Sequence, residues 1–280
     1  MYKLGLIGYP LSHSISGIIQ QAGLKSLNLE GSYEILETPP EDLINRIKYL
    51  KTNNYNGFNV TIPLKVPIAL FLDSVDKYAD IAGCANTIKI DEKDKSFHGY
   101  NTDVTGFQKA IPSDFSLEGK TASILGTGGA SRAVTIGIAE LGISQIDYYT
   151  RNIINSSETI KYFREKFPNI KINVYQIQVL ESLSNTDILI NTTPIGMKGK
   201  AMNEMPVSTE ILETMKKNSL VYDVIYNPIK TLLLEEAEKQ GLRTVNGLDM
   251  LIYQGAKAME IWTGKYPDVK DMKIAALQAL

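Results

Sequence analysis

Residues 121–142 read TASILGTGGASRAVTIGIAELG, a short apolar strand followed by a glycine-rich turn and a run of small and apolar residues that is typical of a buried helix. Glycines permit a tight turn and a close approach of the backbone to a phosphate, whose charge then meets the N–H groups at the start of the helix. The third glycine of the usual GxGxxG pattern is Ser131 here, so the motif is a variant. The stretch indicates a phosphate-binding turn for a dinucleotide, and a purely structural turn is the alternative.

The strand that follows this helix, IDYYT (146–150), is expected to end beside the adenine ribose of such a dinucleotide. An acidic residue at its tip would bind the free 2′-hydroxyl of NAD, but the chain has Thr150, Arg151 and Asn152 there. A guanidinium suits the 2′-phosphate of NADP, and a solvated loop arginine is the alternative interpretation. The stretch NTTPIGM (191–197) follows another apolar strand and is expected to border the same cofactor.

Strands and helices alternate along the rest of the chain. In the second half, strands are expected near residues 122–125, 146–149, 172–175, 188–190 and 221–224, with helices between them. The first half has strands in KLGLIG, SYEILET and GFNVTIP, and helices after Ser14 and from about Pro40 to Lys51. This alternation predicts an α/β fold with mainly parallel sheets.

A polar stretch from Ile111 to Lys120, rich in turn-forming residues, separates the two halves. We place a domain boundary there, which gives a first domain of residues 1–112 and a dinucleotide-binding domain of residues 113–247. Residues 248–280 carry two helical patterns and no strand. These C-terminal helices are expected to pack back on the first domain.

Composition excludes several classes of protein. Of the 280 residues, 44% are apolar and 21% are charged, which argues against a disordered chain or a disulfide scaffold. The formal net charge of −2 provides no field for binding nucleic acid or an anionic membrane. Cys84 is the only cysteine and no apolar run is long enough to span a bilayer, so we expect a cytoplasmic protein. With a single Cys and two His we expect no metal site, and the oligomeric state, monomer or homodimer, stays open.

Candidate catalytic groups follow a strand of the first domain. The stretch GFNVTIPLK (57–65) ends in Lys65, and Asp103 stands at the start of a later helix. Hydride transfer to a ketone requires a proton for the forming alkoxide, and a lysine held by a carboxylate can supply it. The alternatives are a solvated lysine and an aspartate that only caps its helix.

Other polar residues gather at turns and strand ends of the first domain. A polyhydroxylated substrate needs many hydroxyl and amide partners, and such groups occur at Ser14, Ser16, Asn59, Thr61, Asn86 and Thr102. His13 lies between two serines and is expected to be a turn residue rather than a catalytic one. Tyr226, in VYDVIYNP, either reaches a cleft between the domains or is ordinary packing.

The chain resembles shikimate dehydrogenases, and the resemblance runs along its whole length. The matching motifs, in order, are GYPLSHSIS (8–16), GFNVTIPLK (57–65), AGCANTI (82–88), GYNTDVTGF (99–107), LGTGGASRA (125–133), NTTPIGM (191–197), VYDVIYNPIKTLLLEEAEKQG (221–241) and NGLDMLIYQGAKAMEIWTG (246–264). Eight motifs in one order are far more specific than any one of them.

The resemblance implies two domains: an α/β substrate domain completed by the C-terminal helices, and a Rossmann-like dinucleotide-binding domain. It implies reversible reduction of 3-dehydroshikimate to shikimate by NADPH, on the route to aromatic amino acids. Lys65 would be the acid and base, and Asp103 would orient it and bind a substrate hydroxyl. The family's substrate-binding positions fall on Ser14, Ser16, Asn59, Thr61, Asn86, Asp103 and Gln254.

The resemblance also implies three groups of cofactor-binding residues. In the glycine-rich turn they are Gly126, Thr127, Gly128, Gly129, Ala130, Ser131 and Arg132. Thr150, Arg151 and Asn152 would lie at the ribose phosphate, and Met197, Ile225 and Gly247 near the nicotinamide.

The chain departs from the family pattern in two places. After SIS the family continues with proline and then a histidine and an asparagine, whereas this chain has Gly17, Gln20 and Gln21. A second basic residue that the family carries near the ribose phosphate is Asn155 here. A quinate/shikimate dehydrogenase with relaxed use of NAD and NADP therefore stays open. A non-catalytic dinucleotide sensor is a further alternative, against which Lys65 argues because a sensor needs no proton donor.

Overall fold

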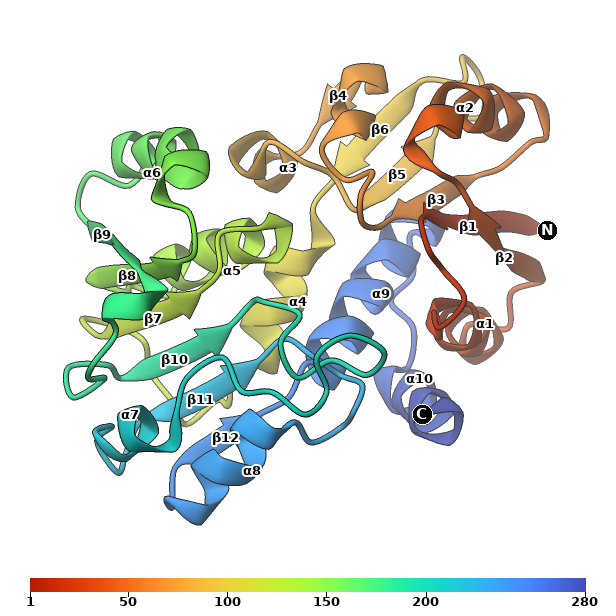
Figure 1. Ribbon diagram of the computed structural model, residues 1–280. Helices are drawn as coiled ribbons and strands as arrows, with labels where there is room; N and C mark the ends of the chain where they lie inside the picture. The colour runs from red at the N-terminus through yellow and green to blue at the C-terminus, as the bar shows by residue number, and fades with distance from the viewer. The chain divides into compact units, whose positions relative to one another are not determined.

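The computed structural model describes residues 1–280 and contains two six-stranded sheets (Figure 1). The backbone contacts divide the chain into unit 1, Met1–Phe107 with Leu251–Leu280, and unit 2, Gln108–Met250. Both passages between the units lie inside helices. Of the ten strand pairings, eight are parallel, which confirms the mainly parallel α/β fold expected from the alternation of elements.

The sheet of unit 1 has the order β2-β1-β3-β5-β6-β4. Its strands are β1 (Tyr2–Gly8), β2 (Gly31–Glu37), β3 (Gly57–Val60), β4 (Ser74–Val75), β5 (Thr87–Ile90) and β6 (Phe97–Tyr100). β5 is antiparallel to both its neighbours. Only residues 91–96 join it to β6, and a parallel pair needs a longer crossover. These residues form the tip of a hairpin.

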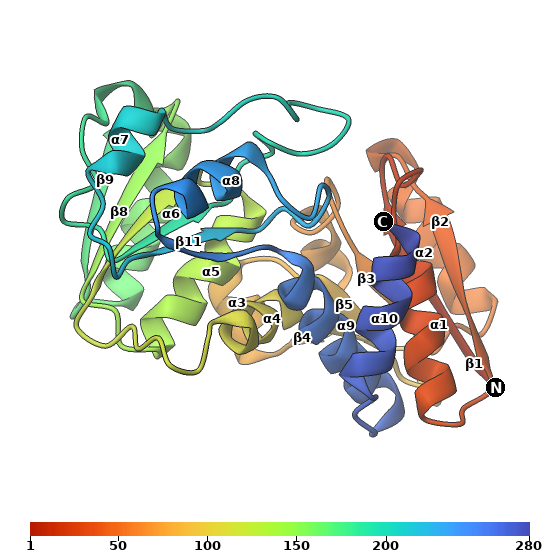
Figure 2. The same ribbon diagram turned by 90° about the horizontal axis from the view of Figure 1, so that it is seen from below.

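Helices cover both faces of this sheet. They are α1 (Ser16–Ser26), α2 (Leu43–Thr52), α3 (Lys77–Ala82), the first part of α4 (Thr102–Ala110), most of α9 (Leu248–Thr263) and α10 (Val269–Ala279), with short 3-10 turns at Pro40–Asp42 and Pro67–Phe71. On one face Leu4 of β1 packs with Leu24 of α1 and Trp262 of α9. On the other, Ile7 packs with Ile47 of α2. Figure 2 shows α1 and α10 side by side, so the C-terminal helices do pack on the N-terminal elements.

Gly57 illustrates how tightly α9 packs on this sheet. The indole Nε1 of Trp262 donates a hydrogen bond of 2.9 Å to the carbonyl oxygen of Ile88 on β5. A Cβ at Gly57 on β3 would lie 2.3 Å from that Nε1, closer than any side chain can approach. The strand that leads to Lys65 is thus fixed against the C-terminal helix.

The sheet of unit 2 is entirely parallel, in the order β12-β11-β10-β7-β8-β9. Its strands are β7 (Thr121–Leu125), β8 (Gln145–Thr150), β9 (Lys171–Gln176), β10 (Ile188–Asn191), β11 (Leu220–Asp223) and β12 (Arg243–Val245). Successive strands are added in one direction from β7 to β9 and in the opposite direction from β10 to β12, so the strand order reverses between β7 and β10. This order is the one typical of dinucleotide-binding folds, in which ligands bind beyond the carboxyl ends of the strands at the reversal point.

Helices cover both faces of this sheet as well (Figure 1). α5 (Gly129–Glu140) and α6 (Ile153–Lys166) lie on one face, and α7 (Thr209–Glu213) and α8 (Leu232–Lys239) on the other, where a core of leucines packs beneath them. The expectation of a helix between every pair of strands is wrong between β9 and β10. Only a 3-10 turn, Ile177–Val179, lies there, and residues of the following loop such as Leu183 fill the core instead. The three-residue strand β12 was not expected either, because its sequence RTV is too short to show a pattern.

No helix is long and apolar enough to cross a membrane.

Candidate active site

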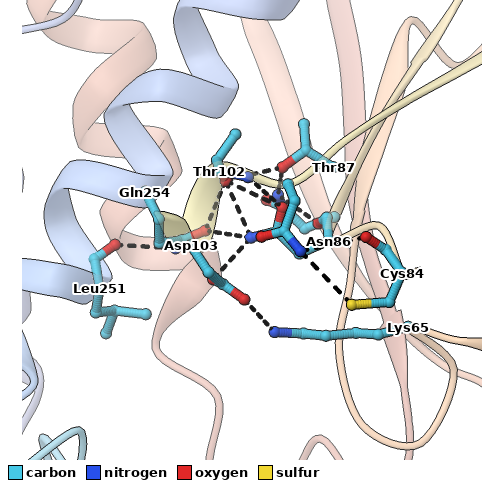
Figure 3. Close-up of polar contacts among 10 residues, drawn as sticks. Lys65, Cys84, Asn86, Thr87, Thr102, Asp103, Leu251 and Gln254 are labelled. Atoms are coloured by element: carbon cyan, nitrogen blue, oxygen red, sulfur yellow. Dashed lines mark hydrogen bonds and ion pairs between the residues drawn. The ribbon is translucent and has the colours of Figure 1, made fainter. Parts of the chain in front are cut away.

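Lys65 and Asp103 form an ion pair in unit 1. The Nζ of Lys65, five residues beyond the end of β3, lies 2.6 Å from Oδ2 of Asp103 in the first turn of α4 (Figure 3). Their side chains are 20% and 11% exposed, so the pair is largely shielded from solvent but not fully buried. The two residues expected to act together are therefore within direct hydrogen-bond distance.

Asp103 does not serve as the cap of its helix. Its Oδ1 accepts a 2.8 Å hydrogen bond from Nδ2 of Asn86, and its Oδ2 binds Lys65. The backbone N–H of Thr102 at the start of α4 is bound instead by Oδ1 of Asn86, at 2.8 Å. Asn86, and not Asp103, therefore caps α4. The carboxylate of Asp103 is directed at the lysine instead.

The ion pair sets the protonation state of Lys65. Burial acts to lower the pKa of Lys65, but the negative charge of Asp103 and the hydrogen bond between the two groups act in the opposite direction and leave the net pKa raised. Lys65 is therefore an ammonium group at neutral pH. It can give a proton to an oxygen that gains negative charge beside it.

Buried amides surround the ion pair. Gln254 of α9 accepts hydrogen bonds through Oε1 from Asn86 Nδ2, at 3.3 Å, and from Thr102 Oγ1, at 3.4 Å, and its own Nε2 donates to the carbonyl of Leu251 (Figure 3). The amide of Gln254 is thereby oriented with one N–H left to donate. This cluster unites four of the residues expected to bind substrate.

Asn59 is the neighbour of this cluster on β3. Its Nδ2 donates to the carbonyl of Asn86 and to Oγ1 of Thr87, and its Oδ1 accepts from the hydroxyl of Tyr33 at 2.8 Å. Both N–H groups of Asn59 are thus used within the protein, and only its carbonyl oxygen retains a free lone pair. Tyr33 and Thr87 were not singled out in the sequence, because a tyrosine and a threonine in strands look like ordinary sheet residues.

Ser14, Ser16 and Thr61 lie in the segments that follow β1 and β3. These strands are parallel neighbours, so their carboxyl ends share one edge of the sheet. All three side chains are half-buried, and the backbone N–H of Ser16 donates to Oγ of Ser14 at 3.3 Å. No hydrogen bond joins them to the Lys65 cluster. His13 is exposed, as expected of a turn residue.

The glycine-rich turn of unit 2 leads from β7 into α5. Gly126 has φ of 93°, a left-handed conformation that favours glycine, and a Cβ there would lie 3.0 Å from Oγ1 of Thr192. Gly128 and Gly129 have no atom within 4 Å of such a Cβ. No side chain caps α5, whose N-cap residue is Gly128. The first N–H groups of the helix therefore have no side-chain partner, and the space beside Gly128 and Gly129 is open, as an anion site requires.

The remaining residues of this turn hold its shape. Ser131, the substitute for the third glycine, is buried and its Oγ donates to the carbonyl of Gly128 at 2.6 Å. The hydroxyl of Thr127 lies 2.7 Å from that of Ser156 on α6, and Nη2 of Arg132 donates to Oγ1 of Thr159. Ala130 is half-buried.

Three expected cofactor residues lie at and just beyond the end of β8, and their surroundings differ. Thr150 is buried, and Asn152 is the N-cap of α6, where its Oδ1 accepts from the N–H of Asn155 at 3.1 Å. Arg151 is exposed and has no ion-pair or hydrogen-bond partner. Of the three, Arg151 alone has a free charged group to offer a phosphate.

The other expected cofactor residues lie beyond the ends of β10, β11 and β12. Met197 is half-buried, Ile225 is buried, and Gly247 donates its N–H to the carbonyl of Ile225 at 2.9 Å. A Cβ at Gly247 would lie 2.0 Å from the carbonyl oxygen of Val224, so two backbones touch there. Tyr226 is half-buried in unit 2, and burial raises its pKa.

No group of three or more His, Cys, Asp or Glu side chains could hold a metal ion.

Comparisons with known proteins show what the chain is similar to. Residues 6–88 match the family model described as the shikimate dehydrogenase substrate binding domain, and residues 247–277 match the shikimate 5'-dehydrogenase C-terminal domain. The protein named shikimate dehydrogenase (NADP(+)) from Caldanaerobacter subterraneus subsp. tengcongensis is 39% identical over 267 residues, which cover 94% of this chain and 92% of that protein.

Solved structures extend the likeness to the whole fold. A shikimate dehydrogenase in complex with NADP+ has a TM-score of 0.90 at 38% identity, over 99% of this chain and 95% of that one. The shikimate 5-dehydrogenase of Thermus thermophilus, in complex with NADP(H) and shikimate, has a TM-score of 0.87 at 32% identity over the full length of both chains.

Proposed function

The chain belongs to the shikimate dehydrogenase family, and from that premise we propose that it catalyses the reversible, NADPH-dependent reduction of 3-dehydroshikimate to shikimate. The reaction serves the synthesis of chorismate and the aromatic amino acids. One observation carries the proposal: the ammonium group of Lys65 is paired at 2.6 Å with a carboxylate that a buried asparagine holds in place. A proton donor arranged in this way is what reduction of a ketone requires.

Lys65 and Asp103 divide the work of proton transfer. As the substrate carbonyl is reduced, its oxygen gains negative charge and takes a proton from Nζ of Lys65. In the opposite direction Lys65 accepts the proton of the hydroxyl that is oxidised. Asp103 keeps Lys65 in position through Oδ2, stabilises its ammonium form, and accepts a hydrogen bond from a neighbouring substrate hydroxyl.

The other polar residues of unit 1 bind the substrate in this proposal. Gln254 donates its free N–H and Asn59 accepts through its carbonyl oxygen, because their remaining groups are engaged within the protein. Asn86 and the hydroxyls of Ser14, Ser16 and Thr61 complete the set. Tyr226 is proposed to contact the substrate from unit 2.

Unit 2 is proposed to bind the nicotinamide cofactor, whose reduced form, NADPH, would supply the hydride. The turn from Gly126 to Arg132 fits a pyrophosphate, because α5 has no side-chain cap and the space above Gly128 and Gly129 is open. Arg151, flanked by Thr150 and Asn152, pairs with the 2′-phosphate. Met197, Ile225 and Gly247 border the nicotinamide.

The domain assignment follows the same division. Residues 1–112, with the helices of 248–280, are proposed as the substrate and catalytic domain, and residues 113–247 as the NADP domain. We further propose a cytoplasmic enzyme, monomeric or homodimeric, that has no nucleic-acid partner. Size-exclusion chromatography with light scattering would distinguish monomer from dimer.

A spectrophotometric assay tests the function directly. The purified protein is incubated with shikimate and NADP, shikimate and NAD, or quinate and NAD, and the reduced cofactor is followed by absorbance, with the Lys65→Ala protein as the background control. We expect the highest kcat/KM with shikimate and NADP. Comparable rates with quinate and NAD would favour the quinate/shikimate dehydrogenase alternative. No turnover with any pair, in a protein that still binds NADP, would favour the sensor.

A further inference from the structure

Asp223 is a fully buried carboxylate that the mechanism above does not use. It is the last residue of β11 and lies opposite Asn191, the last residue of β10, in the parallel register of the sheet. No lysine or arginine pairs with it. A carboxylate buried without a cation is costly unless several donors bind it.

Three neutral donors surround Asp223. Its Oδ1 accepts from Nδ2 of Asn191 and from the N–H of Ile225, both at 3.1 Å. Its Oδ2 accepts from Oγ1 of Thr231 at 2.7 Å. Burial nevertheless raises the pKa of Asp223 to about 6, while these hydrogen bonds act to lower it.

Each donor leads to a segment that we assign to the cofactor site. Oδ1 of Asn191 accepts from the N–H and hydroxyl of Thr193, and its Nδ2 also reaches the carbonyl of Ile195, so Asn191 shapes the loop that ends at Met197. Ile225 accepts the N–H of Gly247. The same two loops are the ones placed beside the nicotinamide.

Thr231 closes the second loop. It caps α8 by accepting from the N–H of Leu234, and its bond to Asp223 ties the two ends of the segment 223–231 together. A Cβ at Gly196 would contact Thr231 at 3.4 Å and Ile225 at 3.6 Å, so the first loop packs directly against the second. The carboxylate is therefore the common anchor of both loops.

We propose that Asp223 is a positioning residue for hydride transfer: it fixes the loops of Met197 and Ile225 against each other and so determines where the nicotinamide ring is held. This inference rests on the proposed function. An amide does not reproduce the carboxylate, because it replaces one acceptor oxygen by an N–H₂ group and at least one of the three donors then loses its acceptor. Displacement of a reacting group by about 1 Å can cost on the order of 100-fold in rate.

The test is the Asp223→Asn variant, with Asp147→Asn as the matched control. Asp147 is another buried carboxylate of the same sheet, but its partners are the side chains of Gln145 and Asn173 on β8 and β9, not the loops. For each variant we measure kcat, the dissociation constant of NADP by fluorescence titration, the folded fraction, and the isotope effect on kcat with shikimate deuterated at the carbon that is oxidised.

We expect Asp223→Asn to lower kcat by about 10-fold or more per folded molecule, with NADP affinity within about 3-fold and an isotope effect at least as large as that of the parent. Asp147→Asn should keep its kcat within about 2-fold. A parental kcat in Asp223→Asn, an equal loss in both variants, or a smaller isotope effect would overturn the proposal.

A second pair of variants covers the case in which Asp223→Asn does not fold. Thr231→Val removes one of the three donors and should lower kcat in the same way, whereas Thr231→Ser keeps the hydroxyl and should restore it. Equal activity of these two would also overturn the proposal. If the parent protein itself does not oxidise shikimate with NADP, the proposed function fails and not this inference alone.

Discussion

Around Lys65 the polar side chains of unit 1 are already bonded to one another, whereas around Gly128 in unit 2 no side chain caps the first N–H groups of α5. In the first region, side chains fix side chains: Asn86 binds Asp103, which binds Lys65. In the second, backbone shape and an uncapped helix provide the site, and added atoms would find free space. The two regions suit different tasks. A preorganised network of side chains can stabilise a transition state, whereas an uncapped helix end gains hydrogen-bond partners only when a ligand binds.

Removal of the lysine should have the largest effect. We expect Lys65→Ala to lower kcat by about 10² to 10⁴, the usual contribution of a placed acid or base, while the affinity for shikimate changes much less. Steady-state kinetics check this, with Lys48→Ala, an exposed lysine of α2, as the control. Turnover within a few-fold of the parent would mean that Lys65 does not transfer the proton.

A milder loss is expected at the next member of the network. Asp103→Asn should impair both kcat and shikimate binding, since the carboxylate is proposed to orient Lys65 and to accept a hydrogen bond from a substrate hydroxyl. The loss of a charged hydrogen bond corresponds to roughly 1.5 to 3 kcal/mol, or about 10- to 150-fold in kcat/KM. Thermal unfolding should change little, because Asn86 caps α4. Normal kinetics in a strongly destabilised protein would contradict this assignment.

Two glycines of the glycine-rich turn test the proposed cofactor site of unit 2. Gly128→Ala adds a methyl group where the protein leaves room, so we expect unchanged stability and a KM for NADP raised by about 10-fold. Gly126→Ala forces a side chain into a left-handed conformation beside Thr192 and should lower the free energy of unfolding by about 1 to 3 kcal/mol. Denaturant titration and cofactor kinetics separate the two effects. An unchanged KM in Gly128→Ala would show that the open space does not serve the cofactor.

The smallest effect concerns the choice of cofactor. Arg151→Ala should raise KM for NADP by about 5-fold and leave KM for NAD and the saturated kcat nearly unchanged, because an exposed guanidinium acts in high dielectric. Lys161→Ala removes one positive charge from the exposed side of the following helix and serves as the control. Equal losses with NADP and NAD would mean that Arg151 supports the fold or the adenine and does not bind the phosphate.

In both regions, local elements could be predicted from the sequence better than contacts between residues distant in the chain. The strand–turn–helix of residues 121–142 was predictable because glycine spacing and apolar runs are local properties. The pairing of Lys65 with Asp103 could be suggested, but the bond from Asn86 that directs it could not. Asn86 lies 17 residues from Asp103, and its contact depends on how β5 and α4 meet. The role of Gln254 came from the family resemblance, since its partner Asn86 is 168 residues away.

The sites that were missed have a common physical origin. Tyr33, Thr87 and Asp223 lie in strands whose periodicity reports burial, and a buried polar residue shows its hydrogen-bond partner only after the sheet has formed. Asp223 did carry one signal, a charged residue that ends the apolar strand LVYD. A carboxylate at the carboxyl end of a buried parallel strand is a reason to search for donors on the next strand.

The interrupted path of the chain through unit 1 has a consequence for how the protein is synthesised. The core formed by Leu4 and Leu24 needs Met259 and Trp262, which leave the ribosome only after all of unit 2. Unit 2 is continuous in sequence and can fold as soon as it emerges. While the inserted residues 108–250 are translated, the apolar face of the N-terminal segment therefore stays uncovered. This nascent chain, more than the finished enzyme, is the form that presents a binding surface to chaperones.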